Sequence, residues 1–237
     1  MKKALIAVVL VVAVLGAGLW YFVLRDDAPE ELTLSDPAPE DTTAGDSTPV
    51  GVDGTWTVQP SEPTAAGYRI KERFIGGAAE HTAVGRTSEV TGSVSIASTQ
   101  VTEGDFTVDM TSLTYTDTPA GLDVANRKRA TENLGIETAK FPEASFTLTA
   151  PIELGTVPEA GKVVTAEAAG DLTLHGVTKA IELTVEAQLT GGDIEVVSAD
   201  PSPVVLADYG MTPPKAGPVA SVADEGSFEF KLVLSKG

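Results

Sequence analysis

Three adjacent cations, Arg127, Lys128 and Arg129, form the most distinctive charged group in an otherwise acidic sequence. Arginine guanidinium groups bind phosphate and carboxylate oxygens through paired, charge-assisted hydrogen bonds. A phosphate-bearing head group is therefore one ligand that this group could hold. The alternative is a solvated helix face, because Lys and Arg are mostly exposed in folded proteins.

Glu72 is the second residue of chemical interest, because it shares the apolar face of an alternating segment with Tyr68 and Phe74. Burying an unpaired carboxylate is costly. Glu72 should therefore lie at a strand end, pair with an arginine or meet a polar group of a ligand. We treat Glu72, Arg127 and Arg129 as candidate head-group contacts.

Residue types that support catalysis or metal binding are sparse. The sequence has no Cys, and its two histidines, His81 and His175, are far apart. It contains neither a G-x-S-x-G nucleophile motif nor a glycine-rich phosphate loop. We predict no catalytic residues, no cofactor and no metal site. A hydrolase of envelope material stays an alternative, although none of the 34 carboxylates is singled out as a catalytic pair.

The N-terminal part of the sequence predicts a membrane anchor followed by a spacer. Residues 4–24 are apolar and uncharged, which is long enough to span a bilayer. Lys2 and Lys3 before this run predict a cytoplasmic N-terminus and an extracytoplasmic domain in the cell membrane. The alternative is secretion after signal cleavage. We assign residues 1–25 to the anchor and residues 26–53, acidic and rich in proline, to a disordered linker.

From residue 54 to residue 237 the sequence alternates between apolar and polar residues, which predicts half-buried antiparallel strands. Turns are expected at 102–104, at His175-Gly176 and at Gly191-Gly192. We predict an all-β domain of about eight strands, closed as a barrel or paired as a sandwich. One short helix is expected at 126–134, before Gly135. The formal charge of −18 argues against a nucleic-acid partner.

The segment DLTLHGVTKAIELTV at 171–185 resembles the signature of the YceI-like family. NRKRATENLGIETAKFPEASFTL at 126–148 is similar to that family's helix and following strand, and the likeness covers about residues 54–236. The resemblance implies a lipocalin-like barrel that holds a polyisoprenoid or similar amphiphile in an apolar pore, without catalysis. Two positions depart from the family pattern, because Lys71-Glu72-Arg73 replaces Lys-His and Arg127-Lys128 replaces Arg-Asp.

The inward apolar positions are the candidate pore lining, and the partner expected there is an apolar or amphiphilic lipid. They are Tyr68, Ile70, Phe74, Phe106, Val108, Met110, Phe146, Leu148, Leu172 and Leu174. Small residues at Ala166, Ala168 and Gly170 favour space inside the barrel. Periodicity alone does not separate a hollow barrel from a filled one, so a structural or adhesive domain displayed on a stalk stays an alternative. The oligomeric state is open, and a homodimer is one option.

Overall fold

The computed structural model describes residues 28–36, 51–75, 80–115, 123–156, 158–215 and 217–237. The predicted anchor at 1–25 lies outside these ranges. Within them, no helix is long and apolar enough to cross a membrane.

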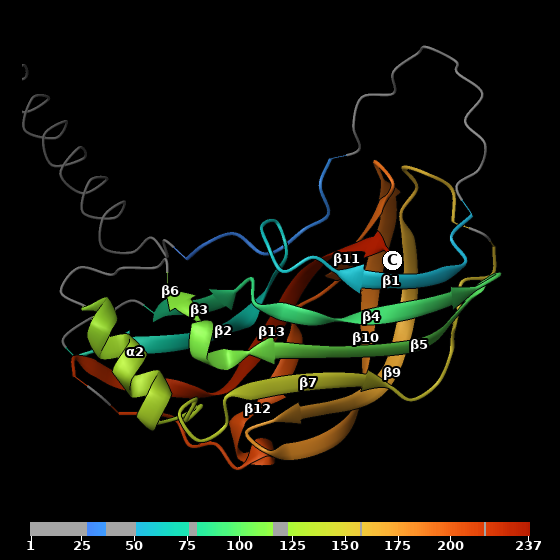
Figure 1. The fold of residues 1–237 in the computed structure, drawn as a ribbon. Coiled ribbons are helices and arrows are strands. Elements are labelled where there is room, and N and C mark those ends of the chain that lie inside the picture. The colour runs from blue at the N-terminus through green and yellow to red at the C-terminus, as the bar shows by residue number, and fades with distance from the viewer. Residues whose placement is uncertain (1–27, 37–50, 76–79, 116–122, 157, 216) are drawn as a thin grey trace, which may run out of the picture.

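The described chain forms a single antiparallel sheet with one α-helix (Figure 1). The strands are β1 (Gly54–Val58), β2 (Ala65–Phe74), β3 (Glu80–Thr87), β4 (Val90–Ala97), β5 (Gln100–Asp109), β6 (Thr114–Tyr115), β7 (Glu143–Leu148), β8 (Ile152–Glu153), β9 (Val164–Leu174), β10 (Val177–Thr190), β11 (Asp193–Ser198), β12 (Ser202–Val205) and β13 (Val219–Lys236). The helix is α2 (Val124–Asn133), and the 3-10 turns are η1 (Met110–Ser112) and η2 (Leu206–Tyr209).

Eight of these strands close into a barrel, as predicted. The ring runs β1-β4-β5-β7-β9-β10-β11-β13, and it closes because β1 pairs with both β4 and β13. The long strand β13 reaches beyond the ring, where its first half pairs with β2 and β12. Strands β2, β3 and β6 extend the wall on that side. A closed ring removes the free strand edges that a sandwich would leave.

The hairpin turns follow from residues that adopt a left-handed backbone. His175 and Gly176 have φ values of 51° and 73° and join β9 to β10 as predicted. Gly191 and Gly192 likewise join β10 to β11. The turn expected at 102–104 is wrong, because β5 is continuous there and the reversal comes earlier, at Ser98 with φ 56°.

Helix α2 forms nearly where it was predicted and lies across one end of the barrel (Figure 1). The Asp123 carboxylate accepts a hydrogen bond from the Ala125 N–H and caps the first turn. Gly135, with φ 68°, follows the helix and lies against Pro214. Throughout, we call this part of the molecule the α2 end of the barrel.

The opposite end holds the main hydrophobic core. Trp56 is fully buried there, and its indole N–H donates to the Val52 carbonyl over 2.7 Å. Leu234, also fully buried, belongs to the same cluster. Several members of this cluster, among them Ala66 and Val90, also line the cavity described below, so the core forms part of its wall.

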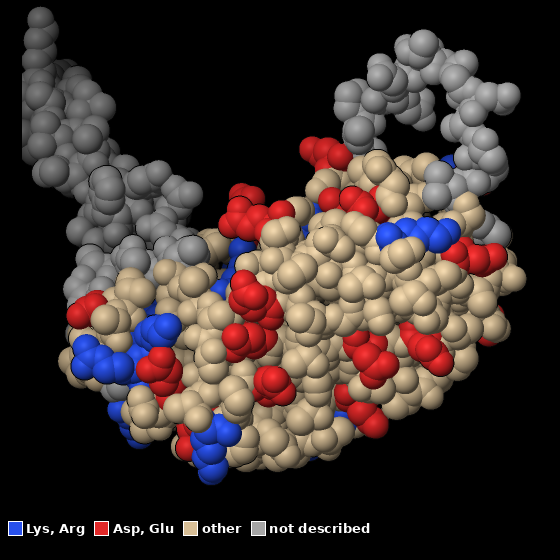
Figure 2. Space-filling model, in the orientation of Figure 1, with Lys and Arg blue, Asp and Glu red and all other residues tan. Residues whose placement is uncertain are grey.

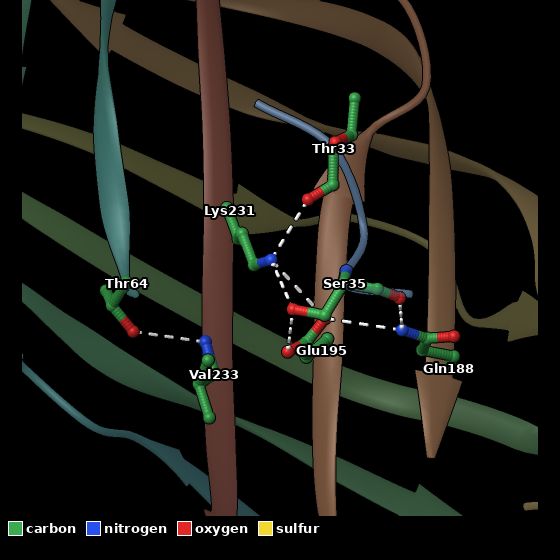
Figure 3. A network of polar contacts seen from close by, with 7 residues as sticks. All are labelled: Thr33, Ser35, Thr64, Gln188, Glu195, Lys231 and Val233. Atoms are coloured by element: carbon green, nitrogen blue, oxygen red, sulfur yellow. Dashed lines mark hydrogen bonds and ion pairs between the residues drawn. The ribbon is translucent and has the colours of Figure 1, made fainter. Parts of the chain in front are cut away.

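Residues 28–36 lie against the outside of the barrel, which differs from the expectation of a disordered spacer (Figure 3). The Ser35 N–H and hydroxyl donate to the Glu195 carboxylate over 2.9 and 2.8 Å. Lys231 donates to the Thr33 carbonyl over 3.0 Å, and Gln188 donates to the Ser35 carbonyl over 2.8 Å. Strand residues far away in the sequence thus fix this segment, which we call the strap.

The strap changes the ionisation of the group that it covers. Burial alone would raise the pKa of Glu195, but the hydrogen bonds from Ser35 and the charge of Lys231 lower this pKa below the usual range of a glutamate. The Glu195 carboxylate lies 3.5 Å from the Lys231 ammonium, and both side chains are 10% exposed. The strap therefore contributes to stabilising the charged form of Glu195, together with Lys231.

Candidate ligand-binding site

The barrel encloses a cavity of about 800 Å³. At the α2 end its lining includes Asn126 and Ala130 of the helix, and at the opposite end it includes Leu154 and Pro158. Carbon-rich side chains from the strands line the space between them. A cavity of this volume is in the range of sites that hold one small molecule.

Nine of the ten predicted pore residues lie on this cavity. They are Tyr68, Ile70, Phe106, Val108, Met110, Phe146, Leu148, Leu172 and Leu174. Phe74 is not part of the lining, and its ring lies beside that of His81, with 5.8 Å between centroids. The two-residue alternation therefore predicted which residues of β5, β7 and β9 face the cavity. The last residue of β2, Phe74, turns away from it.

The three small residues of β9 have two different roles. Ala166 and Ala168 line the cavity, as expected for side chains that leave space. Gly170 does not line it, because the Phe146 ring occupies the place of its side chain. A Cβ at Gly170 would lie 2.2 Å from the Phe146 Cζ. Glycine at this position lets the ring of the neighbouring strand lie flat on β9 and form part of the wall.

Sequence reasoning missed part of the lining that comes from the C-terminal half of the chain. This part includes Leu183, Val185, Ala187, Leu189, Ile194, Val196, Phe228, Phe230 and Leu232. Their alternation along β10, β11 and β13 is the signal that could have placed them. Leu206 and Met211 also line the cavity, but they lie in and after η2, where no periodic pattern exists to find them.

A buried ion pair lies at the α2 end of the cavity. The Arg127 guanidinium donates a hydrogen bond to the Glu72 carboxylate, and the two residues are 9% and 6% exposed. His81 Nε2 lies 4.0 Å from the same Glu72 oxygen. Of the three placements expected for Glu72, the structure shows the pairing with an arginine. The pair joins α2 to β2 across 55 residues of sequence.

Two phenols and a threonine extend this polar region. Burial raises the pKa of the Tyr68 phenol well above its ordinary value, and the neighbouring Tyr115 adds to the effect. Burial also raises the pKa of Tyr115, although hydrogen bonds with Thr131 and Tyr68 oppose the shift. Both phenols therefore stay neutral and can donate or accept hydrogen bonds, and of the two Tyr68 lies on the cavity lining.

The three cations of α2 are placed differently from one another. Arg127 is buried in the ion pair, whereas Arg129 is exposed and contributes to the cavity lining. Lys128 points to solvent and lies 3.9 Å from Glu132, one turn later. Of the predicted head-group contacts, Glu72, Arg127 and Arg129 all lie on the cavity.

His175 connects three segments at the rim. Its Nδ1 lies 3.1 Å from the Tyr209 carbonyl, and its Nε2 lies 2.7 Å from the Glu137 carboxylate. Its ring packs on Phe141 with 4.0 Å between centroids. The histidine thus orders the β9–β10 turn and fixes it to the segment after α2.

The cavity is suited to hold a hydrocarbon chain with its polar end toward α2. Its walls are mostly carbon, and at the α2 end the charged residues Glu72 and Arg127 on its lining neutralise each other. Within the ranges that the structure describes, no three His, Asp or Glu side chains come together as a metal site.

Comparison with known proteins identifies the family. The family model described as YceI-like domain matches residues 56–234, so the chain belongs to the YceI-like family. No curated protein sequence matches the chain.

Two solved structures have a similar fold. One is a polyisoprenoid-binding domain from Saccharophagus degradans, described as implicated in plant cell wall breakdown, with 19% identity, a TM-score of 0.58, and coverage of 77% of this chain and 98% of that one. The other is BcnA of Burkholderia cenocepacia, with 17% identity, a TM-score of 0.50, and coverage of 74% and 98%. At these identities the likeness concerns the fold alone.

Proposed function

We propose that this YceI-like domain binds an apolar or amphiphilic lipid, isoprenoid-like in shape, inside its barrel and does no chemistry on it. The observation that carries the proposal is the cavity of about 800 Å³ with its apolar lining. The polyisoprenoid-binding domain of Saccharophagus degradans, which has a similar fold, supports this class of ligand.

Burial of hydrocarbon can supply the affinity. Each buried CH₂ group contributes about 0.8 kcal/mol, so about ten of them contribute about 8 kcal/mol, which corresponds to a dissociation constant in the micromolar range. Loss of translational and rotational freedom lowers this value, and additional methylenes raise it. Polar contacts are then needed for orientation rather than for affinity.

The polar head group of the ligand belongs at the α2 end. Arg127 already satisfies Glu72 there, so this pair leaves little uncompensated charge to bind a strongly anionic group. Arg129 is the exposed cation on the lining, and the Tyr68 phenol is neutral. We therefore favour a head group that accepts hydrogen bonds, with any phosphate held by Arg129 at the rim.

We further propose that the domain is extracytoplasmic and stays attached to a membrane through residues 1–25. The uncharged apolar run at 4–24, with lysines before it, supports this orientation. A tether would keep the barrel at high local concentration near its lipid ligand.

Native mass spectrometry of protein purified without detergent tests the lipid proposal. We expect a bound species of lipid mass, or uptake of added prenyl lipids by an empty domain. A domain that is always empty and takes up neither prenyl lipids nor fatty amphiphiles would refute it.

A further inference from the structure

Large apolar side chains are exposed at the α2 end of the barrel. Val124 begins α2 and is 38% exposed, and Leu134 caps it and is 45% exposed. Ile75 follows β2 and is 71% exposed, and its N–H donates to the Pro218 carbonyl at the cavity rim. Among the described residues only Val163 and Val205 are comparably exposed elsewhere. Because Leu134 is both exposed and part of the cavity lining, the cavity reaches the surface at this end. Exposed apolar groups beside such an opening indicate a contact surface.

Cations accompany these apolar groups. Lys71, Arg73 and Lys128 have side chains 66%, 54% and 51% exposed, and Arg129 and Lys140 are also exposed. On the face drawn in Figure 2, Lys and Arg gather mostly at the end where α2 lies, while Asp and Glu predominate over the strands.

The acidic groups at this end are mostly paired. Glu80 lies 3.0 Å from Arg73 and 3.7 Å from Lys71, Glu132 lies near Lys128, and Asp123 caps α2. These pairs also engage Lys71, Arg73 and Lys128, and Glu143 is exposed on the cavity lining. Cations and acids are therefore balanced at the α2 end, in contrast to the whole chain with its formal charge of −18.

The strap brings the N-terminal segment toward the same end. The Glu30 carbonyl accepts hydrogen bonds from Arg86 of β3 and Arg69 of β2. Arg69 lies three positions before Glu72, the residue that pairs with α2. In the sequence, the apolar run at 4–24 ends four positions before Ala28, the first described residue of the strap.

We propose that the α2 end of the barrel docks on an anionic lipid bilayer, so that the cavity opens toward the membrane from which its ligand is drawn. The inference rests on the proposed lipid-binding function. Anionic lipids attract cations near the surface, and exposed Ile, Val and Leu side chains enter the boundary between head groups and acyl chains. A lipid could then pass into the cavity without crossing water.

Introduced cysteines test the docking cleanly, because the natural sequence has none. Full-length chains carrying either Val124→Cys or Val163→Cys are labelled with a polarity-sensitive fluorophore in nanodiscs. Val163 is the matched control, because it is an exposed valine, 52% exposed, at the far end of the barrel. In nanodiscs with anionic lipid we expect the label at 124 to report an apolar environment and the label at 163 to report water.

Charge reversal supplies the second arm. Lys128→Glu should lower the ratio of docked to undocked protein about five-fold or more, since each cation contributes about 1 kcal/mol at an anionic surface. Lys162→Glu, at the far end and likewise in a local ion pair, should leave the ratio unchanged. Neither lysine lines the cavity.

The docking surface would be refuted if the labels at 124 and 163 both reported water, or if both reported the same apolar environment. It would also be refuted if the label at 124 reported an apolar environment without lipid, because that result indicates a protein partner. Native mass spectrometry of the same samples separates this inference from the proposed function. A bound lipid with a water-exposed label at 124 removes the docking surface alone, whereas a docked but always empty barrel removes the ligand.

Discussion

Replacing Arg127 by Met isolates the contribution of the buried ion pair to stability. The substitution keeps an unbranched side chain of similar length on α2 but leaves the Glu72 carboxylate, 6% exposed, without its guanidinium partner. His81 Nε2 lies 4.0 Å from that oxygen, which is beyond hydrogen-bond distance.

The expected loss is about 3–5 kcal/mol in the free energy of unfolding, the range for removing one partner of a buried pair. Much of it comes from the cost of keeping the Glu72 carboxylate buried without the guanidinium, rather than from the attraction itself. The double variant Glu72→Gln with Arg127→Met should therefore recover most of the loss, because it removes both charges. A loss of this size is a large part of a typical domain stability of about 5–15 kcal/mol.

Denaturant unfolding at neutral pH, with the ligand state held constant, measures these values. Arg73→Met is the matched control, because Arg73 pairs with Glu80 over 3.0 Å but both side chains are about half exposed. We expect this variant to stay near the wild-type stability. If Arg127→Met were as mild as Arg73→Met, or if the double variant recovered nothing, the pair would not be buried as described.

Two further perturbations test the cavity and the strap. Ala166→Phe adds a ring to the cavity wall and should reduce the amount of lipid bound. Thr165→Phe, at the neighbouring position that faces outward, should leave it unchanged. Extraction and quantification of the bound lipid measures both variants. Ser35→Ala should cost about 1–2 kcal/mol at neutral pH, because it removes the hydroxyl that donates to Glu195. Since the strap holds the pKa of Glu195 below its usual range, this stability is present above the pKa of the unfolded chain and is lost as the pH falls through the folded pKa. The difference between wild type and Ser35→Ala should shrink in acid-unfolding curves, and a constant difference would contradict the role of the strap.

The barrel could be predicted because its signals are local. Alternating apolar residues mark the inward face of each strand, and the glycines at 176, 191 and 192 mark the turns. The error at 102–104 has the same origin, because Gly104 reads as a turn signal. In the structure it is a strand residue on the cavity, where its missing side chain leaves room beside Phe106 and Leu148.

The polar contacts of the site could be predicted only in kind. The sequence requires a partner for a carboxylate on an apolar face, but it does not say that Arg127 rather than Arg129 supplies it. That choice depends on how α2 lies across the barrel end. Likewise, Glu195 and Lys231 read as ordinary solvent-facing residues of alternating strands. Their burial depends on the strap, which lies about 160 residues before Glu195 in the sequence, and no local sequence pattern predicts that contact.

Because the barrel is hollow, the contents of its cavity affect the free energy of unfolding. Cavities created in cores by mutation cost about 24 cal/mol per Å³, and at this rate an empty, dry cavity of about 800 Å³ would cost about 19 kcal/mol. That upper bound exceeds the net stability of most domains. The interior must therefore contain water or a guest, and an apolar wall offers water few hydrogen-bond partners. A hydrocarbon chain restores the missing contacts at no polar cost, so the physical features that make this barrel a poor solid core also favour its occupation by lipid.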